Sequence, residues 1–170
     1  HLDKVTHILE GKNTYVTAPW NKGAKFAAYN KLLVMNDDNW FDLSLLDTIH
    51  DYITPTIGMI GMAEENHTEN WSKWPNMVGL EPITHRNGGF GCIFFIHKDN
   101  WNEIPEEMKI WGQDDWLFCT NRNAGRQNYK LINFKIEGHI SLTHEANENN
   151  EEFIKIREND LKLKAKYNLF

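Results

Sequence analysis

The sequence predicts an α/β fold, in which a mixed central sheet is flanked by helices in a single domain. Apolar runs of strand length alternate with helix-like runs along the chain, which is the pattern of α/β domains. A chain of 170 residues with 41% hydrophobic residues can bury one substantial core. No repeat, low-complexity tract or linker divides it. We therefore expect residues 1–170 to form one domain that ends in a C-terminal surface helix over residues 149–170.

The first half of the chain predicts a helix, a strand, a second helix and a second strand. Residues 21–31 are Ala-rich and begin with an asparagine that can cap a helix. Apolar runs within residues 32–36 and 56–63 predict buried strands. Between them an apolar residue recurs at every fourth position, which predicts a helix that ends before Pro55. The face of this helix comprises Phe41, Leu45, Ile49 and Ile53, with Leu46 beside them.

The second half predicts two further strands and two further helices. A glycine-rich turn leads into an apolar strand within residues 88–96. Residues 114–123 predict a helix that Gly125 ends. Residues 129–136 predict a strand, and residues 151–166 predict the C-terminal helix. The apolar faces of these last two elements are Ile132, Phe134 and Ile136, and Phe153, Ile156 and Leu161.

The composition argues against several classes of function. A net charge of -6 and a pI of about 5.7 argue against a nucleic acid as the main partner. Cys92 and Cys119 are too far apart in the sequence for a chelating Cys-x-x-Cys pair. The sequence contains no apolar run of about 18 residues and no apolar signal core at its start. We therefore expect no membrane span and a cytoplasmic location.

The first candidate site is Asn36-Asp37-Asp38, where a hydrophobic strand ends in three groups with oxygen ligands. Alternation in an extended chain predicts that Asn36 and Asp38 share a face and that Asp37 points the other way. Ligands of open α/β sheets bind at the carboxyl ends of strands, and oxygen donors suit Mg²⁺ or Mn²⁺, which can bridge to a diphosphate. The alternative is an ordinary acidic turn that caps the following helix.

The second candidate site is Asp114-Asp115, at the start of a predicted helix. Exposed backbone N–H groups favour ionised carboxylates there, and an ionised carboxylate can act as general base toward a sugar hydroxyl. The alternative is helix capping by Asp114.

The third candidate site is His139 and His144, which follow a predicted strand. Either imidazole could complete the coordination of a metal held by Asp38, or both could be solvated.

Taken in order, these segments resemble the family 2 glycosyltransferases. Asn21-x-Gly23 is similar to the family's Asn-x-Gly segment, and residues 32–38 resemble its strand ending in the Asp-x-Asp motif. Residues 89–96 are similar to the strand that follows its acceptor region. Residues 112–117 resemble its Gly-Glu-Asp-x-Asp-Leu run, and residues 139–143 its His-x-x-Ser motif. The resemblance implies a GT-A-like, that is Rossmann-like, fold.

The resemblance also implies an inverting, metal-dependent transfer of a sugar from a nucleotide-diphosphate sugar to a hydroxyl of a glycan or other acceptor. Asp114 would be the catalytic base, beside Asp115. The metal, Mn²⁺ or Mg²⁺, would be bound by Asp38 and by His139, with His144 as the rival. The nucleotide sugar and its diphosphate would be contacted by Asn36, Asp37 and Gly89.

The sequence departs from the family pattern at three points. Asn36 stands where the family has its first Asp, and Gln113 where it has Glu. The family also carries further strands ahead of the segment equivalent to Asn21, so the resemblance predicts an N-terminally short or reduced version.

Two other readings of the sequence stay open. One is a metal-dependent phosphoesterase or nuclease that uses Asp37, Asp38, Asp114 and His139. The other is a non-catalytic carbohydrate-binding module, in which tryptophan side chains, seven in this sequence, bind sugar rings instead of filling the core.

Overall fold

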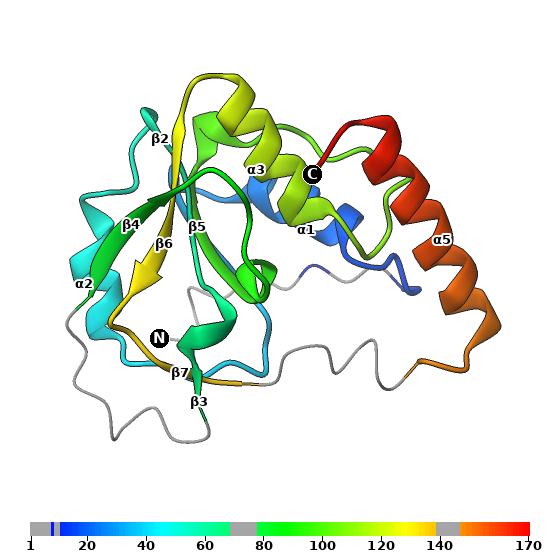
Figure 1. The fold of residues 1–170 in the computed structure, drawn as a ribbon, viewed down its shortest axis with the longest axis horizontal. Coiled ribbons are helices and arrows are strands. Elements are labelled where there is room, and N and C mark those ends of the chain that lie inside the picture. The colour runs from blue at the N-terminus through cyan, green and yellow to red at the C-terminus, as the bar shows by residue number, and fades with distance from the viewer. Residues whose placement is uncertain (1–7, 9–10, 69–77, 139–146) are drawn as a thin grey trace.

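The computed structural model describes residues 8, 11–68, 78–138 and 147–170 and shows a mixed α/β fold in which helices surround a mixed sheet (Figure 1). The helices of the described ranges are α1 (Thr17–Phe26), α2 (Ser44–His50), α3 (Gln113–Asn123) and α5 (Glu151–Lys166). The strands are β1 (Lys31–Met35), β2 (Ile57–Gly61), β3 (His67–Thr68), β4 (Gly79–Ile83), β5 (Ile93–His97), β6 (Gln127–Ile132) and β7 (Ile136–Glu137). Within these ranges no helix combines the length and the apolarity that crossing a membrane requires.

The main sheet has five strands in the order β1-β5-β2-β6-β4. Strand β5 is antiparallel to both β1 and β2, β2 is parallel to β6, and β4 is antiparallel to β6. The predicted strand-helix-strand order is present, and β1 and β2 point the same way, but β5 lies between them. A second sheet pairs β3 with β7 in parallel.

Helices cover both faces of the main sheet. Helix α2 lies on one side, and α1, α3 and α5 lie on the other (Figure 1). Alternate residues of the central strands therefore enter different cores. Phe94 belongs to the core under α1 and α3, whereas its neighbour Phe95 belongs to the core under α2. Met59 and Ile60 of β2 divide in the same way.

One edge of the sheet collects the segments that carry the predicted site. Met35, the last residue of β1, pairs with Ile93, the first residue of β5, and Gly61, which ends β2, pairs with Phe94. Because β1 and β2 end where β5 begins, the chain after Met35, the chain after Gly61 and the turn before Ile93 meet at this edge.

The first helix lies earlier in the chain than predicted, over Thr17–Phe26 instead of residues 21–31. Asn21 does not cap it. Its side-chain oxygen accepts hydrogen bonds from the Ile104 N–H at 3.0 Å and from the Trp101 indole at 3.2 Å, and its amide nitrogen donates to the Ile104 carbonyl at 2.8 Å. Asn21 is thus an internal helix residue that fixes the segment before α3.

The strand predicted over residues 129–136 is wrong in its second part. Strand β6 ends at Ile132, and Asn133 adopts a left-handed backbone with φ of 56°. The chain turns there and leaves the main sheet for β7. Helix α2 is also shorter than predicted, and Leu46, placed beside its apolar face, is 37% exposed. Strand β4 lies over residues 79–83, for which the sequence predicted neither a helix nor a strand.

The predictions for α3 and α5 are confirmed to within a residue or two. The apolar face of α5 is only partly as predicted: Leu161 is 47% exposed, and Leu163 is buried in its place. The helix is also more than a surface element, because one of its own residues, Asp160, is fully buried.

Candidate functional site

Four of the residues singled out in the sequence line one cavity of about 420 Å³. They are Asn36, Gly89, Asp114 and Asp115. They come from the end of β1, the turn before β5 and the first turn of α3, which meet at the edge described above. Basic side chains complete the wall: Arg86, Arg157 and Lys164.

Asp114 lines this cavity from the first turn of α3. Gly112, with a left-handed φ of 100°, is the N-cap, so the alternative that Asp114 caps the helix is not what the backbone shows. One oxygen of Asp114 accepts from the Asp115 N–H at 3.0 Å, and the other lies 3.1 Å from Nη1 of Arg86. Burial raises the pKa of the Asp114 carboxyl; the neighbouring Arg86 guanidinium opposes this shift and the Asp115 carboxylate adds to it.

The turn before β5 approaches Asp114 closely. A Cβ atom added at Gly91 would lie 2.9 Å from Oδ2 of Asp114. Any larger residue at 91 would therefore displace the carboxylate. The absence of a side chain at Gly91, in the glycine-rich turn before β5, thus leaves room for the Asp114 carboxylate.

Asp115 is held by two cations. Its Oδ2 lies 2.7 Å from Nζ of Lys164, and its Oδ1 accepts a short hydrogen bond from Nε of Arg86. The residue is 6% exposed. Because Arg86 contacts both Asp114 and Asp115, this guanidinium fixes the two carboxylates relative to each other.

Strand β1 ends at Met35, and Asp37 and Asp38 form a turn. The predicted strand alternation from Asn36 to Asp38 therefore does not describe this turn. Asp37 is exposed, whereas Oδ1 of Asp38 accepts from the Asn39 amide at 3.2 Å. The turn does not cap α2 either, because the first N–H of that helix, at Ser44, donates a hydrogen bond to Oδ1 of Asp42.

The Cys92 thiol links the Asp38 turn to the Asp114 cavity. Burial raises the pKa of this thiol to about 11, and the carboxylates of Asp38 and Asp114 both add to the shift. Both carboxylates are thus close enough to act on one buried sulfur. Two of the three predicted sites therefore lie at the same edge of the sheet.

The third predicted site follows Gly138. A Cβ atom at Gly138 would lie 3.2 Å from the Asp38 carbonyl oxygen, and Glu137 forms two backbone hydrogen bonds with Trp40, at 2.7 and 2.9 Å. The chain therefore reaches residue 138 beside the Asp38 turn. His139 and His144, the predicted metal ligands, lie outside the described residues.

His67 is a candidate that the sequence reasoning missed. Both ring nitrogens are buried and have no hydrogen-bond partner among the described residues. Burial lowers the pKa of the imidazole, and the Gly138 backbone and the Asp38 and Glu64 carboxylates partly oppose this shift. The sequence signal for His67 was weak: it lies in the polar segment that follows the strand predicted within residues 56–63.

The donor chemistry around Asp38 suits a hard divalent cation, but only as part of a set. Among the described residues no group of three or more His, Cys, Asp or Glu side chains is placed to hold a metal ion. Asp38 offers a carboxylate, and His67 offers an imidazole whose nitrogens are unused. Ions such as Mg²⁺ take further ligands from water and substrate phosphates, so these donors fit a site completed by a diphosphate.

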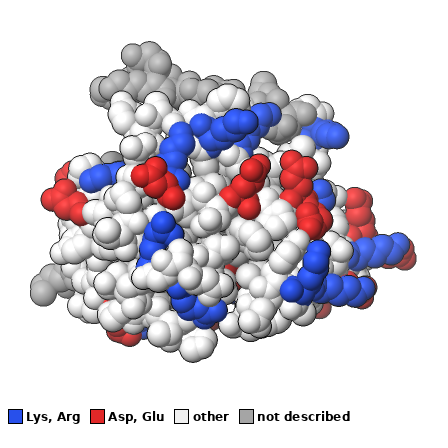
Figure 2. Space-filling view, turned by 90° about the horizontal axis from the view of Figure 1, so that it is seen from above, with Lys and Arg blue, Asp and Glu red and all other residues white. Residues whose placement is uncertain are grey.

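Arg86 and Lys164 were also missed, because each is one basic residue in a polar stretch of the sequence and their meeting depends on tertiary structure. Lysine and arginine side chains are interspersed with acidic ones on the face seen from above α3 (Figure 2). The basic groups of the cavity are therefore a local feature of an acidic chain.

A scan of protein-family models found no family that matches this chain, and searches of curated proteins and of solved structures found no match either.

Proposed function

We propose that this chain is a metal-dependent glycosyltransferase with a GT-A-like fold, which transfers a sugar from a nucleotide-diphosphate sugar to a hydroxyl group. One observation carries the proposal: Asn36, Gly89, Asp114 and Asp115 line a single cavity. The first two belong to segments that would contact the donor, and the last two to the segment that would act on the acceptor. The electrostatic effect of Asp38 on Cys92 adds the proposed metal-binding turn to the same edge.

Asp114 has the properties of a general base. Its raised pKa makes its carboxylate a stronger proton acceptor than an ordinary aspartate. In the proposed step the acceptor oxygen forms a bond to the anomeric carbon as the bond to the diphosphate oxygen breaks. The hydroxyl proton passes to Asp114, and the anomeric carbon inverts. Asp115, held by Arg86 and Lys164, is a positioning residue in this scheme.

The donor would lie along the Asn36 side of the cavity. Arg86, Arg157 and Lys164 outnumber the two carboxylates, Asp114 and Asp115, in the wall of this cavity, and the excess positive charge favours a diphosphate. Asn36 and Asp37 would contact the nucleotide sugar. A divalent cation held by Asp38 and an imidazole would supply Lewis-acid stabilisation of the departing diphosphate; His67 joins His139 and His144 as a candidate for that imidazole.

Thermal unfolding with UDP or GDP, with and without Mn²⁺, tests the proposal. A ligand at about 100 times its Kd stabilises the folded state by about 2.7 kcal/mol, which raises Tm by roughly 5–10 °C for a chain of this size. We expect a rise that requires Mn²⁺ and is lost in Asp38→Ala. The matched control is Asp51→Ala, because the Asp51 side chain is 92% exposed at the end of α2. A rise that Asp38→Ala leaves unchanged would contradict the proposal.

The same preparation separates the two rival functions. Cleavage of the donor's diphosphate to a nucleoside monophosphate and a sugar phosphate with no acceptor present, faster than any transfer, would indicate a phosphoesterase. Glycan binding that is indifferent to both Mn²⁺ and nucleotide, with no metal-dependent rise in Tm, would indicate a carbohydrate-binding module. Transfer to an added acceptor that disappears in Asp114→Asn would support the glycosyltransferase.

A further inference from the structure

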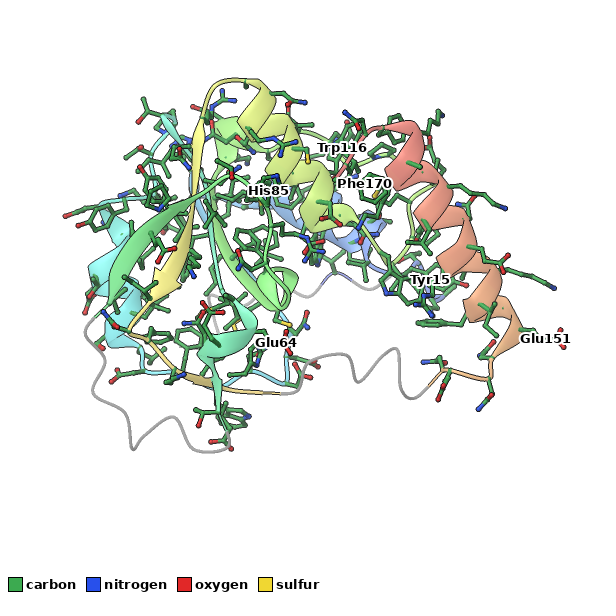
Figure 3. All side chains as sticks on the ribbon, viewed as in Figure 1. Tyr15, Glu64, His85, Trp116, Glu151 and Phe170 are labelled. Atoms are coloured by element: carbon green, nitrogen blue, oxygen red, sulfur yellow. The ribbon has the colours of Figure 1, made fainter. Side chains whose placement is uncertain are left out.

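A second cavity, of about 390 Å³, lies between the segment before α1 and the first turns of α5. Val16 and Ile110 line both this cavity and the one that contains Asp114. The two cavities therefore adjoin across these two side chains. Tyr15 lies beside the first half of α5, with Glu151 at the start of the helix (Figure 3).

The wall of this second cavity has the chemistry of a site for a neutral, hydroxyl-rich ligand. It combines aromatic rings and aliphatic groups with side-chain amides and one carboxylate. Rings pack against the apolar side of a sugar, and amides offer both donors and acceptors to hydroxyl groups. The residues of these kinds are Tyr15, Phe153, Val16, Ile110, Ile156, Asn13, Asn147, Asn150 and Glu152.

The two cavities differ in charge. The Asp114 cavity is lined by three basic side chains, Arg86, Arg157 and Lys164, against the two carboxylates of Asp114 and Asp115. The described residues that line the second cavity include no lysine or arginine, and Glu152 adds a negative charge. An anionic diphosphate therefore fits the first cavity and is disfavoured in the second. A neutral saccharide has no such preference and can occupy the second.

Tyr15 is held in an unusual conformation at this wall. Its φ of 61° lies in the left-handed region, which a bulky side chain rarely adopts. Three hydrogen bonds maintain it. The Tyr15 N–H donates to Asn13 Oδ1 at 2.9 Å, and the phenol donates to Glu152 Oε1 at 2.8 Å. The N–H of the next residue, Val16, donates to the Lys109 carbonyl oxygen at 3.0 Å. Strained residues that their surroundings hold in place are concentrated at functional sites.

The ring of Phe153 is also fixed. It meets Trp111 edge to face at a centroid distance of 4.8 Å, and the first turn of α5 is capped by Asn150, whose side chain accepts from the Glu152 and Phe153 N–H groups. Preorganised rings lose little freedom when a ligand binds. The wall is therefore rigid on the α5 side as well as on the Tyr15 side.

We propose that this cavity is the acceptor subsite for a neutral saccharide, in which Tyr15 and Phe153 contact the sugar unit next to the one whose hydroxyl reaches Asp114. This inference rests on the proposed function for the role of acceptor, but the saccharide site itself does not. It makes the acceptor a glycan of at least two sugar units, since one unit lies at each cavity.

Saturation-transfer NMR with lactose, maltose, cellobiose and N,N′-diacetylchitobiose tests this site, without nucleotide or metal. We expect at least one of these neutral disaccharides to bind, and Tyr15→Ala to weaken its binding about tenfold, which corresponds to about 1.4 kcal/mol. Tyr29→Ala is the matched control, because Tyr29 is 81% exposed and lines neither cavity. Binding should be unchanged in that variant.

Two milder variants keep the test valid if Tyr15→Ala does not fold. Tyr15→Phe retains the ring and loses the bond to Glu152, and Glu152→Gln removes the charge; a loss of affinity in either supports the site. Parent-like affinity in both, no binding by any of the four disaccharides, or binding of sialyllactose alone would overturn it. Saccharide binding that persists while the Mn²⁺-dependent nucleotide shift is absent would refute the glycosyltransferase and leave the saccharide site standing.

Discussion

Adjacent carboxylates in α3 have different surroundings. Asp115 forms ion pairs with both Arg86 and Lys164, whereas Asp114 pairs with Arg86 alone among the described residues, and burial raises the pKa of Asp114. Environments that separate two neighbouring acids in this way are how a protein assigns them different tasks. At the scale of single residues, the distinction favours Asp114 as the group that exchanges a proton.

The raised pKa of Asp114 predicts the pH dependence of transfer. The base works only when ionised, so the rate should fall as the pH drops through a pKa that lies above the ordinary value of 3.8. The sign for stability is opposite: a carboxyl whose folded pKa is raised favours folding below 3.8 and loses that contribution as the pH rises through the folded pKa. A pH-rate profile and urea unfolding at several pH values check both.

Asp114→Asn should lower the rate of transfer by about 10²–10⁴-fold and abolish the pH dependence of stability that this group causes.

A methyl group at residue 91 should disturb Asp114 without disturbing the fold. In Gly91→Ala the new Cβ would lie 2.9 Å from the Asp114 oxygen, so the carboxylate must move. Displacement of a catalytic group by about 1 Å can lower the rate about 100-fold. Gly23→Ala is the control, because no atom lies within 4 Å of its added Cβ, and it should stabilise α1 by about 0.5–1 kcal/mol. Equal transfer rates in the two variants would argue against Asp114 as the base.

At the scale of elements, α5 supports the site through a buried carboxylate. Asp160 accepts hydrogen bonds from three successive backbone N–H groups, at Lys109, Ile110 and Trp111, over 2.8–3.0 Å. Ile110 and Trp111 line the Asp114 cavity. The helix therefore fixes the loop that shapes the cavity as well as supplying Lys164.

Removal of this anchor should be costly. Asp160→Asn replaces one acceptor oxygen by a donor that faces backbone N–H groups, and a buried donor without a partner costs about 1–3 kcal/mol. We expect urea unfolding to show a loss of that size with an unchanged m value. Glu158→Gln, at an exposed position of the same helix, should change stability by less than about 0.5 kcal/mol. A smaller loss in Asp160→Asn than in Glu158→Gln would contradict this account.

The elements that the sequence predicted well are those with a continuous local pattern. Strands β1, β2 and β5 are apolar runs, although Leu32 is the one buried residue of the edge strand β1, where a buried strand was predicted. Helices α3 and α5 have helical spacing with clear ends. Strand β4 was missed because Glu81 and Pro82 interrupt it, and such residues are tolerated on an edge strand. The end of β6 was missed because Asn133 breaks a pattern that the apolar residues alone continue.

Parts of the site could be predicted for the same reason. Asn36, Gly89, Asp114 and Asp115 each follow or begin an element with a local pattern. Arg86, Lys164 and His67 have no such pattern, since each acquires its role from residues distant in the chain. The register that brings them together is a property of the sheet and of α5, and it is not encoded near any of them.

At the scale of the whole molecule, the sheet separates two cores, and the core under α1 and α3 is the one that contains residues of the helix carrying Asp114. Phe94 packs with α1 and α3, and Phe95 packs with α2. Both side chains are almost fully buried. The two adjacent positions therefore allow the contribution of each core to be measured separately.

Phe94→Leu and Phe95→Leu form a matched pair. Each should destabilise the fold by about 1–3 kcal/mol, since each leaves space in a packed core. Hydrogen exchange should show faster opening of α3 amides in Phe94→Leu and of α2 amides in Phe95→Leu. Mn²⁺-dependent nucleotide binding should weaken more in Phe94→Leu. Identical exchange patterns in both variants would show that the two cores open as one unit.

The position of β5 between β1 and β2 has a consequence for how the chain acquires its structure. The two strands are synthesised before their common neighbour, which begins only at Ile93. Until then β1 and β2 expose the backbone N–H and C=O groups that β5 pairs with in the folded sheet. Pairings so distant in sequence slow folding and favour association of nascent chains. Synthesis of this protein should therefore depend on chaperones that shield β1 and β2 until β5 is inserted.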